Sequence, residues 1–551
     1  MAAPAAFVLI KRHTSTLAEP SGVLRCQTSV RGWWLFAALS LAACTRQPPQ
    51  LVPAQRSPDA ATPAERILEA SDLIRAGCLD CLIAAHQTYV DLLNVPGAGK
   101  EANERAVRAA ALIAVREREL GMVDGGWLAE ARRLAESSPA LAGSVAPLFE
   151  IAETLGGRGP VASGPSASDA QLRAAASASR NLEAWTARLE ERADDDELTA
   201  YLWVAFSCSY GNPTTDQAEA VASAVPRWKD TPLIRFRLAS CTSVRFPALE
   251  GLFADDSRFI EVGYYSGLQA LILGDLETAE AHLARANTWR PRWPPVTSLR
   301  AGAFMTAEDF ERAADLYGQT LALIPDDVEA LFGRLRSLVY VGRYTDALIA
   351  ADSLLALEQA YIGDAYYWRA MAEQHLERYD DAWNSVERAA KLLTNADVPK
   401  LAGIIAVQRR QLSVARPKFE EARERNRSDC ETPYFLGAVL VEQQEWRDSV
   451  DALADAADCF DRSQAGLEAD IARIRASPQA PDRQARQIAR REQRITMEGR
   501  MRATARFNAA VALFNVSRYG EAKAYAERLT DDEQFGERAR LLLSRLPSVA
   551  R

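Results

Sequence analysis

The sequence is poor in histidine, a residue on which metal binding and acid–base catalysis often depend. Only 4 of its 551 residues are histidine. His86, His282 and His375 lie beyond residue 43, and none stands in an HExxH arrangement or at a metal-ligand spacing. We therefore expect no metal site, no cofactor, no catalytic residues and no enzymatic activity.

Long hydrophobic runs are also absent. No apolar stretch reaches the roughly 18 residues that a helix needs to cross a bilayer. The composition, with 48% hydrophobic and 25% charged residues, is ordinary for a soluble globular protein. The sequence therefore predicts no membrane-spanning helix.

Positive charge is in deficit. The formal net charge is −9, and it falls to −12 without the first 43 residues, which carry four cationic side chains and one acidic one. Phosphate binding needs clustered cations, so this balance argues against nucleic acid as a partner.

Residues 1–43 have the pattern of an export signal. Arg25 and Arg31 precede a short apolar run, Trp33 to Ala43, of the length typical of a signal core. The run ends in Leu41-Ala42-Ala43-Cys44, which resembles the lipobox of bacterial lipoproteins. This resemblance implies that Cys44 is lipidated and becomes the mature N-terminus.

Residues 44–62 continue this pattern. They are rich in Pro, Gln and Ala without helical periodicity, as expected of a tether behind a lipid anchor. By the same resemblance, Thr45 rather than Asp beside the cysteine implies an outer-membrane lipoprotein that faces the periplasm. Because the signal begins far from Met1, we expect translation to start near Val23 or Val30.

One pattern returns about every 34 residues between residues 260 and 463. Its clearest form is Gly342-Arg343-Tyr344-Thr345-Asp346-Ala347, a tight turn into a helix that opens with a small residue. The same place in successive units, at spacings of 34, 34, 35, 33 and 34, holds Ala279, Ala313, Ala347, Ala382, Ala415 and Ser449. A second set follows seven residues later: Ala286, Thr320, Leu354, Ala389, Ala422 and Ala456. Small residues at fixed places allow two helices to cross closely.

This register resembles the tetratricopeptide repeat (TPR), a helix-turn-helix unit of 34 residues. The resemblance implies an all-α solenoid of stacked antiparallel helix pairs, with six repeats at 260–463. It also implies a concave face, lined by the first helix of each pair, that binds segments of other proteins.

Weaker helical patterns surround the array. We expect a TPR-like segment at 63–155, a Gly-, Ser- and Pro-rich linker at 156–168, degenerate helical pairs at 169–257, an Arg-rich helical insertion at 464–502, and a last repeat with a capping helix at 503–551. In the first segment, Ile67, Leu68, Leu73 and Ile74 are expected on one buried face. In the insertion, Arg483, Arg486, Arg490 and Arg494 form a stripe, which either contacts an acidic partner or lipid headgroups, or is a solvated face.

Aromatic residues recur at the fifth position of the repeats, which usually points to the concave face in TPR proteins. The residues there are Tyr264, Ser298, Phe332, Tyr367, Lys400, Tyr434 and Phe507. Five of the seven are aromatic, against 8% in the whole chain. They either anchor a ligand or pack between repeats. Arg336, Tyr340 and His375, further along the same helices, are candidates to fix a ligand's polar groups.

Six cysteines remain beyond Cys44, and an even number in an exported chain permits disulfides. They form three candidate pairs: Cys78 with Cys81, Cys208 with Cys241, and Cys430 with Cys459. The last two are residues 1 and 30 of the sixth repeat, which places the start of one helix beside the end of its partner. The Cys78-x-x-Cys81 spacing lacks a thioredoxin-like context, so we expect a structural disulfide or packed thiols.

The function that the sequence favours is binding. We expect a lipid-anchored scaffold or assembly factor that captures a peptide segment or helix of another envelope protein. The alternatives are an envelope enzyme, an accessory subunit of one, or a protein that binds glycan or lipid.

Overall fold

The computed structural model describes residues 61–149 and 189–547, apart from 123–124, 144, 147–148, 192, 210–214, 241–250, 253, 255–256 and 480. The export signal, Cys44, most of the tether and the linker at 156–168 lie outside these ranges. The chain divides into two units, Met1–Arg66 and Ile67–Arg551, and the fold described below is that of the second. All regular elements in the described ranges are helices.

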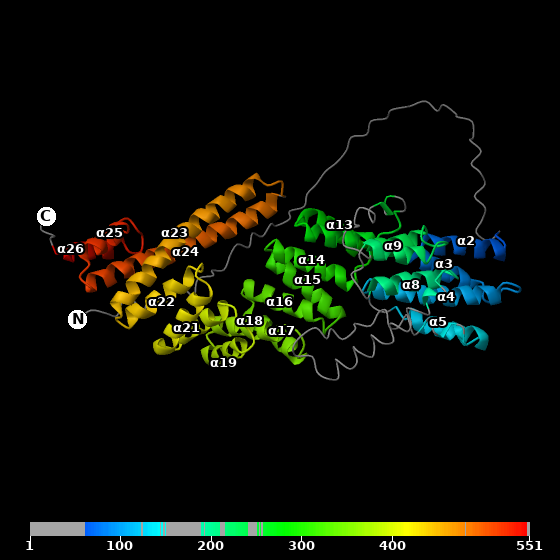
Figure 1. Ribbon diagram of the computed structural model, residues 1–551, viewed down its shortest axis with the longest axis horizontal. Coiled ribbons are helices and arrows are strands. Elements are labelled where there is room, and N and C mark those ends of the chain that lie inside the picture. The colour runs from blue at the N-terminus through cyan, green and yellow to red at the C-terminus, as the bar shows by residue number, and fades with distance from the viewer. Residues whose placement is uncertain are drawn as a thin grey trace, which may run out of the picture. The chain divides into compact units, whose positions relative to one another are not determined.

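Six helix pairs follow one another from residue 262 to residue 476 (Figure 1). The first helices are α12 (Val262–Ile272), α14 (Pro294–Thr306), α16 (Val328–Tyr340), α18 (Ile362–His375), α20 (Asp397–Gln408) and α22 (Glu431–Glu442). The second helices are α13 (Leu276–Trp289), α15 (Phe310–Leu323), α17 (Tyr344–Ala356), α19 (Tyr379–Ala390), α21 (Leu412–Arg425) and α23 (Trp446–Ala476). Each helix packs against the helices before and after it, so the chain is an all-α, TPR-type solenoid.

The two sets of small residues lie where these helices cross. The six residues of the first set, from Ala279 to Ser449, are 0% exposed, and those of the second set are at most 1% exposed. A larger side chain at these places would push the paired helices apart. The register predicted from the sequence is therefore confirmed.

Each first helix ends in the same left-handed turn. The residue there has φ between 59° and 79° in seven units: Gly274, Glu308, Gly342, Glu377, Arg410, Gln444 and Ser517. The next amide donates to the carbonyl five residues earlier, as Asp309 N does to Phe304 O at 2.8 Å. This is the Schellman ending of a helix, which favours glycine at the left-handed position. Five of the seven units nevertheless carry another residue there.

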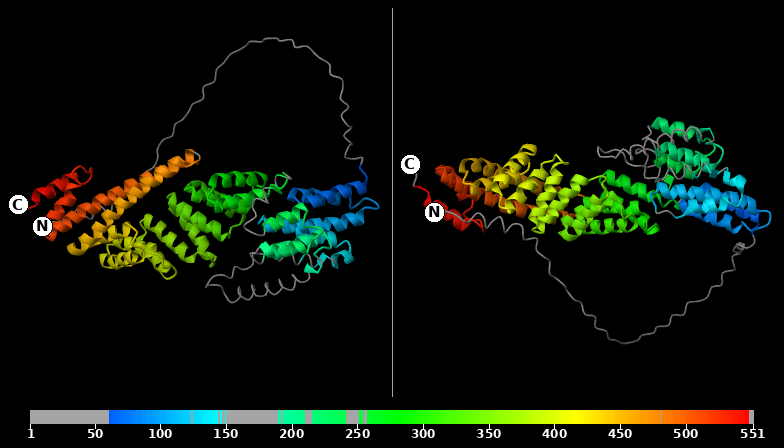
Figure 2. Two further views of the ribbon diagram at one scale, coloured as in Figure 1. Left: turned by 45° about the horizontal axis from the view of Figure 1, so that its top comes forward. Right: turned by 90° about the horizontal axis from the view of Figure 1, so that it is seen from below.

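The Arg-rich insertion lengthens one helix pair. α23 runs for 31 residues and α24 (Pro481–Asn515) for 35, whereas the other helices of the array have 11 to 14. Their extended ends pack on each other as a hairpin, here called the α23–α24 hairpin (Figure 2). The second half of α24 then pairs with α25 (Tyr519–Glu527), and α26 (Gly536–Arg545) follows at the predicted capping position.

The N-terminal helices share a core with the array. They are α2 (Pro63–Ala76), α3 (Leu79–Asp91), α4 (Gly99–Glu119), α5 (Trp127–Ala135), α8 (Glu197–Ser209), α9 (Thr215–Ser223) and α10 (Pro232–Ser240). One hydrophobic cluster extends from Ile67 to Val296. Described helices before and after the linker at 156–168 thus contribute to the same hydrophobic cluster. Leu68 is 59% exposed, because its neighbour Ile67 takes the buried side of α2, so Leu68 is not part of the expected buried face.

A buried charged network joins α4 to α8, α10 and the start of α12. Arg116 is 0% exposed and donates to Tyr201 Oη and Glu261 Oε1, at 3.0 Å each. Arg237 donates to Glu119 Oε1 at 2.9 Å, and Glu119 also accepts from Tyr201. Burial disfavours the charge on Arg116, yet Tyr201 and the two carboxylates raise its pKa above the ordinary value. The cation therefore stays charged and links helices that are distant in the sequence.

Candidate functional site

Three neighbouring repeats contribute to a continuous series of stacked rings and cations. We call it the aromatic–arginine chain, and its members in order are Tyr361, Phe332, Arg336, Trp368, Tyr340, Phe310 and Arg490. Five of them belong to α16, to α18 or to the turn before α18, Phe310 opens α15, and Arg490 comes from α24. Segments up to about 180 residues apart in the sequence thus meet at one site.

The first half of the chain surrounds Arg336. Phe332 stacks on Tyr361 with ring centroids 4.3 Å apart, and Tyr361 Oη donates to Glu329 Oε1 at 2.7 Å. The Arg336 guanidinium carbon lies 5.4 Å from the Phe332 ring and 5.7 Å from the Trp368 ring. Its Nε atom is buried and has no hydrogen-bond partner among the described residues. An acceptor on a ligand would satisfy this donor.

The second half of the chain is more open. Tyr340, 47% exposed, meets Trp368 at 5.3 Å edge to face and stacks on Phe310 at 4.3 Å. The Arg490 guanidinium carbon lies 4.3 Å from the Phe310 ring centroid. Rings of this kind offer large apolar area, and the two arginines add positive charge. The aromatic–arginine chain thus offers a ligand both apolar surface and positive charge.

Two arginines of the α24 stripe, Arg486 and Arg490, and the adjacent Arg491 contact an acidic turn of the protein itself. Arg491 Nη1 lies 2.9 Å from both carboxylate oxygens of Glu308, and Arg490 Nε lies 3.7 Å from Glu308 Oε2. Arg486 Nε lies 3.8 Å from Asp309 Oδ2. Figures 1 and 2 show the tip of the hairpin beside the first repeats. This contact lies within the protein itself, so it is neither the contact with an acidic partner or lipid headgroups nor the solvated face that the sequence suggested.

Arg483 also faces carboxylates, whereas Arg494 does not contact the acidic turns. Burial lowers the pKa of Arg483 and of Arg490, while facing carboxylates, Glu277 and Asp275 for Arg483, oppose that effect. Arg494 instead donates to Glu498 on its own helix, at 2.6 Å. Arg494 therefore does not belong to the contact with the acidic turns.

Of the residues singled out in the sequence, Phe332, Arg336 and Tyr340 come together in the aromatic–arginine chain. Tyr367 lies at its edge, with its ring centroid 5.6 Å from that of Trp368. His375 stacks on Tyr344 at 4.6 Å instead of joining the chain.

The other aromatic residues at the fifth position pack on neighbouring aromatic rings. Tyr434 is 6% exposed within a core with Leu453 and Phe460, and burial raises its pKa to about 12. Tyr264 packs on Trp293 at 5.3 Å, and Phe507 stacks on Phe535 at 4.9 Å. Of these three residues only Tyr434 is buried, whereas Tyr264 and Phe507 are partly exposed, so a continuous row of ligand anchors stays a prediction.

Three members of the aromatic–arginine chain, Trp368, Phe310 and Tyr361, were not singled out in the sequence, and Arg490 was singled out only as part of the arginine stripe. Trp368 directly follows a fifth-position residue, so an aromatic pair at 367–368 was an available signal. Phe310 is the first residue of α15 and Tyr361 lies in the turn before α18, so both are outside the first-helix positions that the repeat pattern highlights. Arg490 reaches the site only through the fold of the hairpin.

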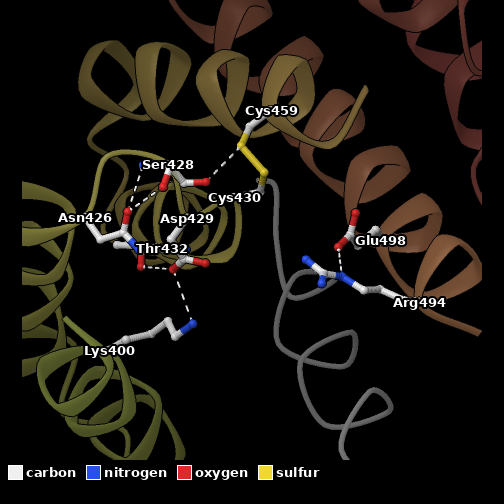
Figure 3. The surroundings of a disulfide bond; sticks show 9 residues. All are labelled: Lys400, Asn426, Ser428, Asp429, Cys430, Thr432, Cys459, Arg494 and Glu498. Carbon is white, nitrogen blue, oxygen red and sulfur yellow. Dashed lines mark hydrogen bonds and ion pairs between the residues drawn. A yellow bond between two sulfur atoms is a disulfide. The ribbon is translucent and has the colours of Figure 1, made fainter. Parts of the chain in front are cut away.

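The predicted bridge between Cys430 and Cys459 is present, with Cα atoms 5.3 Å apart (Figure 3). It joins the start of α22 to α23 near the point where α23 continues into the hairpin. Beside it lies a hollow of about 500 Å³, with Lys400 and Glu498 among its lining residues. Lys400 lies 3.3 Å from Asp429 and 3.2 Å from Glu431, so it is paired within the array.

The CxxC pair is also bridged, with Cα atoms of Cys78 and Cys81 5.0 Å apart. The two residues are 0% and 3% exposed, and Cys78 Sγ accepts from Cys81 N at the start of α3. Such burial favours a structural role over thiol exchange. Cys208 lies in the last turn of α8, but Cys241 lies outside the described residues, so the third bridge stays a prediction.

The described residues contain neither a candidate metal site nor a candidate membrane-spanning helix. Within it, no group of three or more His, Cys, Asp and Glu residues could hold a metal ion. No helix in the same ranges is long and apolar enough to span a bilayer.

Comparison with known proteins adds the following. No family model and no curated protein matches this chain. Among solved structures, MamA from Desulfovibrio magneticus RS-1 is 19% identical over 31% of this chain and 96% of its own, with a TM-score of 0.29. YrrB, described as a TPR protein with an unusual peptide-binding site, is 18% identical over 41% of this chain and 99% of its own, with a TM-score of 0.31. A TPR protein from Parabacteroides merdae ATCC 43184 is 14% identical over 40% of this chain and 86% of its own, with a TM-score of 0.33. At these scores the likeness says nothing of a ligand.

Proposed function

We propose that this protein is a scaffold that binds a peptide segment or helix of another protein on the aromatic–arginine chain. The observation that carries the proposal is the continuity of this chain, in which partly exposed rings and cations follow one another without a gap across three repeats. Rings placed on rigid helices bury much apolar area at little cost in conformational entropy, which is why aromatic residues and arginine dominate binding hot spots.

Two members of the aromatic–arginine chain, Tyr340 and Arg336, would make binding selective for particular peptide segments. Tyr340 is 47% exposed and presents apolar surface, whereas Arg336 keeps a buried donor without a partner. A segment that places an apolar side chain on Tyr340 and an acceptor at Arg336 would satisfy both. A segment without the acceptor would leave the donor unpaired, as it is in the free protein, and would forgo the roughly 1.5–3 kcal/mol that a hydrogen bond to a charged group contributes.

We further propose that the scaffold is held at the outer membrane, facing the periplasm, by a lipid on Cys44. This part of the proposal rests on the sequence: the apolar signal core, the lipobox-like Leu41-Ala42-Ala43-Cys44 and Thr45 beside it. A Cys44→Ser variant should leave the membrane fraction for the soluble fraction, because two acyl chains are needed for stable retention. A wild-type protein that is already soluble after export would refute it.

In-cell crosslinking followed by mass spectrometry tests the binding function. Phe332→Ala and Trp368→Ala should each weaken capture of the partner by about 2 kcal/mol, which is roughly thirtyfold in affinity. Ile349→Ala is the matched control. Ile349 is 64% exposed on a second helix, α17, and is not a member of the aromatic–arginine chain. Capture that is unchanged by both aromatic substitutions, in proteins with wild-type melting behaviour, would exclude this site.

A further inference from the structure

The arginine stripe of α24 holds a specific three-residue segment of the array. Glu308, Asp309 and Phe310 are consecutive, and each one meets an arginine. Both carboxylate oxygens of Glu308 accept from Arg491 Nη1. Asp309 faces Arg486, and the Phe310 ring lies against the guanidinium of Arg490. Two carboxylates followed by a ring are thus bound by three cations on one helix face.

The contact is complementary but only partly buried. The side chains of Arg490 and Arg491 are 36% and 24% exposed, and that of Glu308 is 29% exposed. Ion pairs at such exposure contribute little net stability, because water and salt screen them. A contact of this strength holds when nothing competes and yields to a ligand that offers the same groups with additional ones.

The occupied surface continues directly into the proposed binding site. Phe310 is stacked between Arg490 and Tyr340, so the hairpin closes the open end of the aromatic–arginine chain. A segment that reaches Tyr340 from this end meets Phe310 and then Arg490. The arginines of the hairpin and the rings of the array therefore form one surface with two kinds of chemistry.

We infer that the partner segment carries carboxylates followed by an aromatic residue, and that the protein's own Glu308-Asp309-Phe310 occupies its place on the hairpin until it binds. This inference rests on the proposed function, because it names the chemistry of the segment that the scaffold takes. It also makes the site self-occluded: the tethered segment acts at a high effective concentration, which lowers the apparent affinity for any partner.

Fluorescence anisotropy with a labelled peptide tests the inference. The probe contains two Glu-Asp-Phe units, and a second peptide with Gln-Asn-Phe in their place is the charge control. In the double variant Glu308→Gln/Asp309→Asn, the arginines lose their internal partners, so the probe should bind at least tenfold more tightly than to wild type. Adding Arg490→Gln/Arg491→Gln to that variant should remove the gain. Raising the salt concentration should weaken binding of the probe to the Glu308→Gln/Asp309→Asn variant, in which no internal carboxylates of this segment compete for the arginines.

Arg473→Gln/Arg500→Gln is the matched control, because both residues are exposed arginines of the same hairpin that do not meet the segment. These substitutions should leave the affinity unchanged. Equal binding to wild type and to the Glu308/Asp309 variant, or no binding to either, overturns the inference. If partner capture in cells still depends on Phe332 and Trp368 in that event, the proposed function stands and only the acidic chemistry fails.

Discussion

The left-handed turns give a prediction that separates backbone strain from side-chain contacts. Gln444 has φ 61° and is exposed, at the same place in its unit as Gly342, which has φ 79°. A residue with a Cβ atom costs about 1–2 kcal/mol in this conformation. Glycine relieves that strain but adds about 0.5–1 kcal/mol of conformational entropy to be lost on folding. Gln444→Gly should therefore raise the free energy of unfolding by roughly 0.5–1 kcal/mol, the difference between the two effects.

Equilibrium denaturation in urea measures this difference, and hydrogen exchange at α22 and α23 locates it. Gly342→Ala should show the opposite sign, a loss of about 1 kcal/mol, because it introduces the same strain. Glu387→Gly is the control for glycine itself. Glu387 is exposed in the interior of α19, where glycine should cost about 1 kcal/mol. A destabilised Gln444→Gly variant would refute the argument from strain, since the substitution removes no buried contact.

Two further predictions concern buried charge. Burial raises the pKa of Glu197 from 4.5 to about 7, so its neutral form stabilises the fold below pH 4.5 and this contribution is lost as the pH rises to about 7. Glu197→Gln should therefore match wild type near pH 4.5 and exceed it at pH 8 by up to about 3 kcal/mol in urea denaturation, and equal stabilities at pH 8 would contradict this. Arg116→Met leaves the carboxylate of Glu261 buried without its cation and should lower the free energy of unfolding by about 3–5 kcal/mol, and Glu261→Gln in the same chain should recover part of it. A loss below about 1 kcal/mol would mean that the network is not charged as described.

The repeat fold could be predicted from the sequence because its signal is local and repeated. Ala279, Ala347 and Ala415 each indicate the same close crossing of two neighbouring helices. A repeat that is hard to recognise by itself is therefore identified by its spacing from the others. The disulfide between Cys430 and Cys459 followed from the same register. In both cases the residues that touch lie within one repeat or its neighbour.

What could not be predicted depends on contacts between distant segments. Arg116 meets Glu261 across 145 residues, and Arg491 meets Glu308 across 183. Nothing in the local pattern around Arg491 distinguishes a solvated arginine from one that binds an acidic turn. For the same reason the sequence could not decide whether a fifth-position aromatic residue anchors a ligand or packs between repeats. Tyr434 and Phe332 occupy equivalent positions and differ only in the side chains that the adjoining helices place against them.

The base of the hairpin gives the last prediction. The bridge between Cys430 and Cys459 closes a loop with a sequence separation of 29, beside the point where α23 leaves the array to form the hairpin. A loop of this length should stabilise the sixth repeat by about 3 kcal/mol, and the Cys78–Cys81 bridge, with a separation of 3, by far less. Cys430→Ser/Cys459→Ser should therefore speed hydrogen exchange in α22 and in the first half of α23, while Cys78→Ser/Cys81→Ser should leave these helices unchanged. Because the hairpin positions Arg490 against Phe310 from this base, the first variant should also bind the Glu-Asp-Phe probe with altered affinity. Unchanged exchange in α22 after removal of the bridge would show that helix packing alone fixes the base of the hairpin.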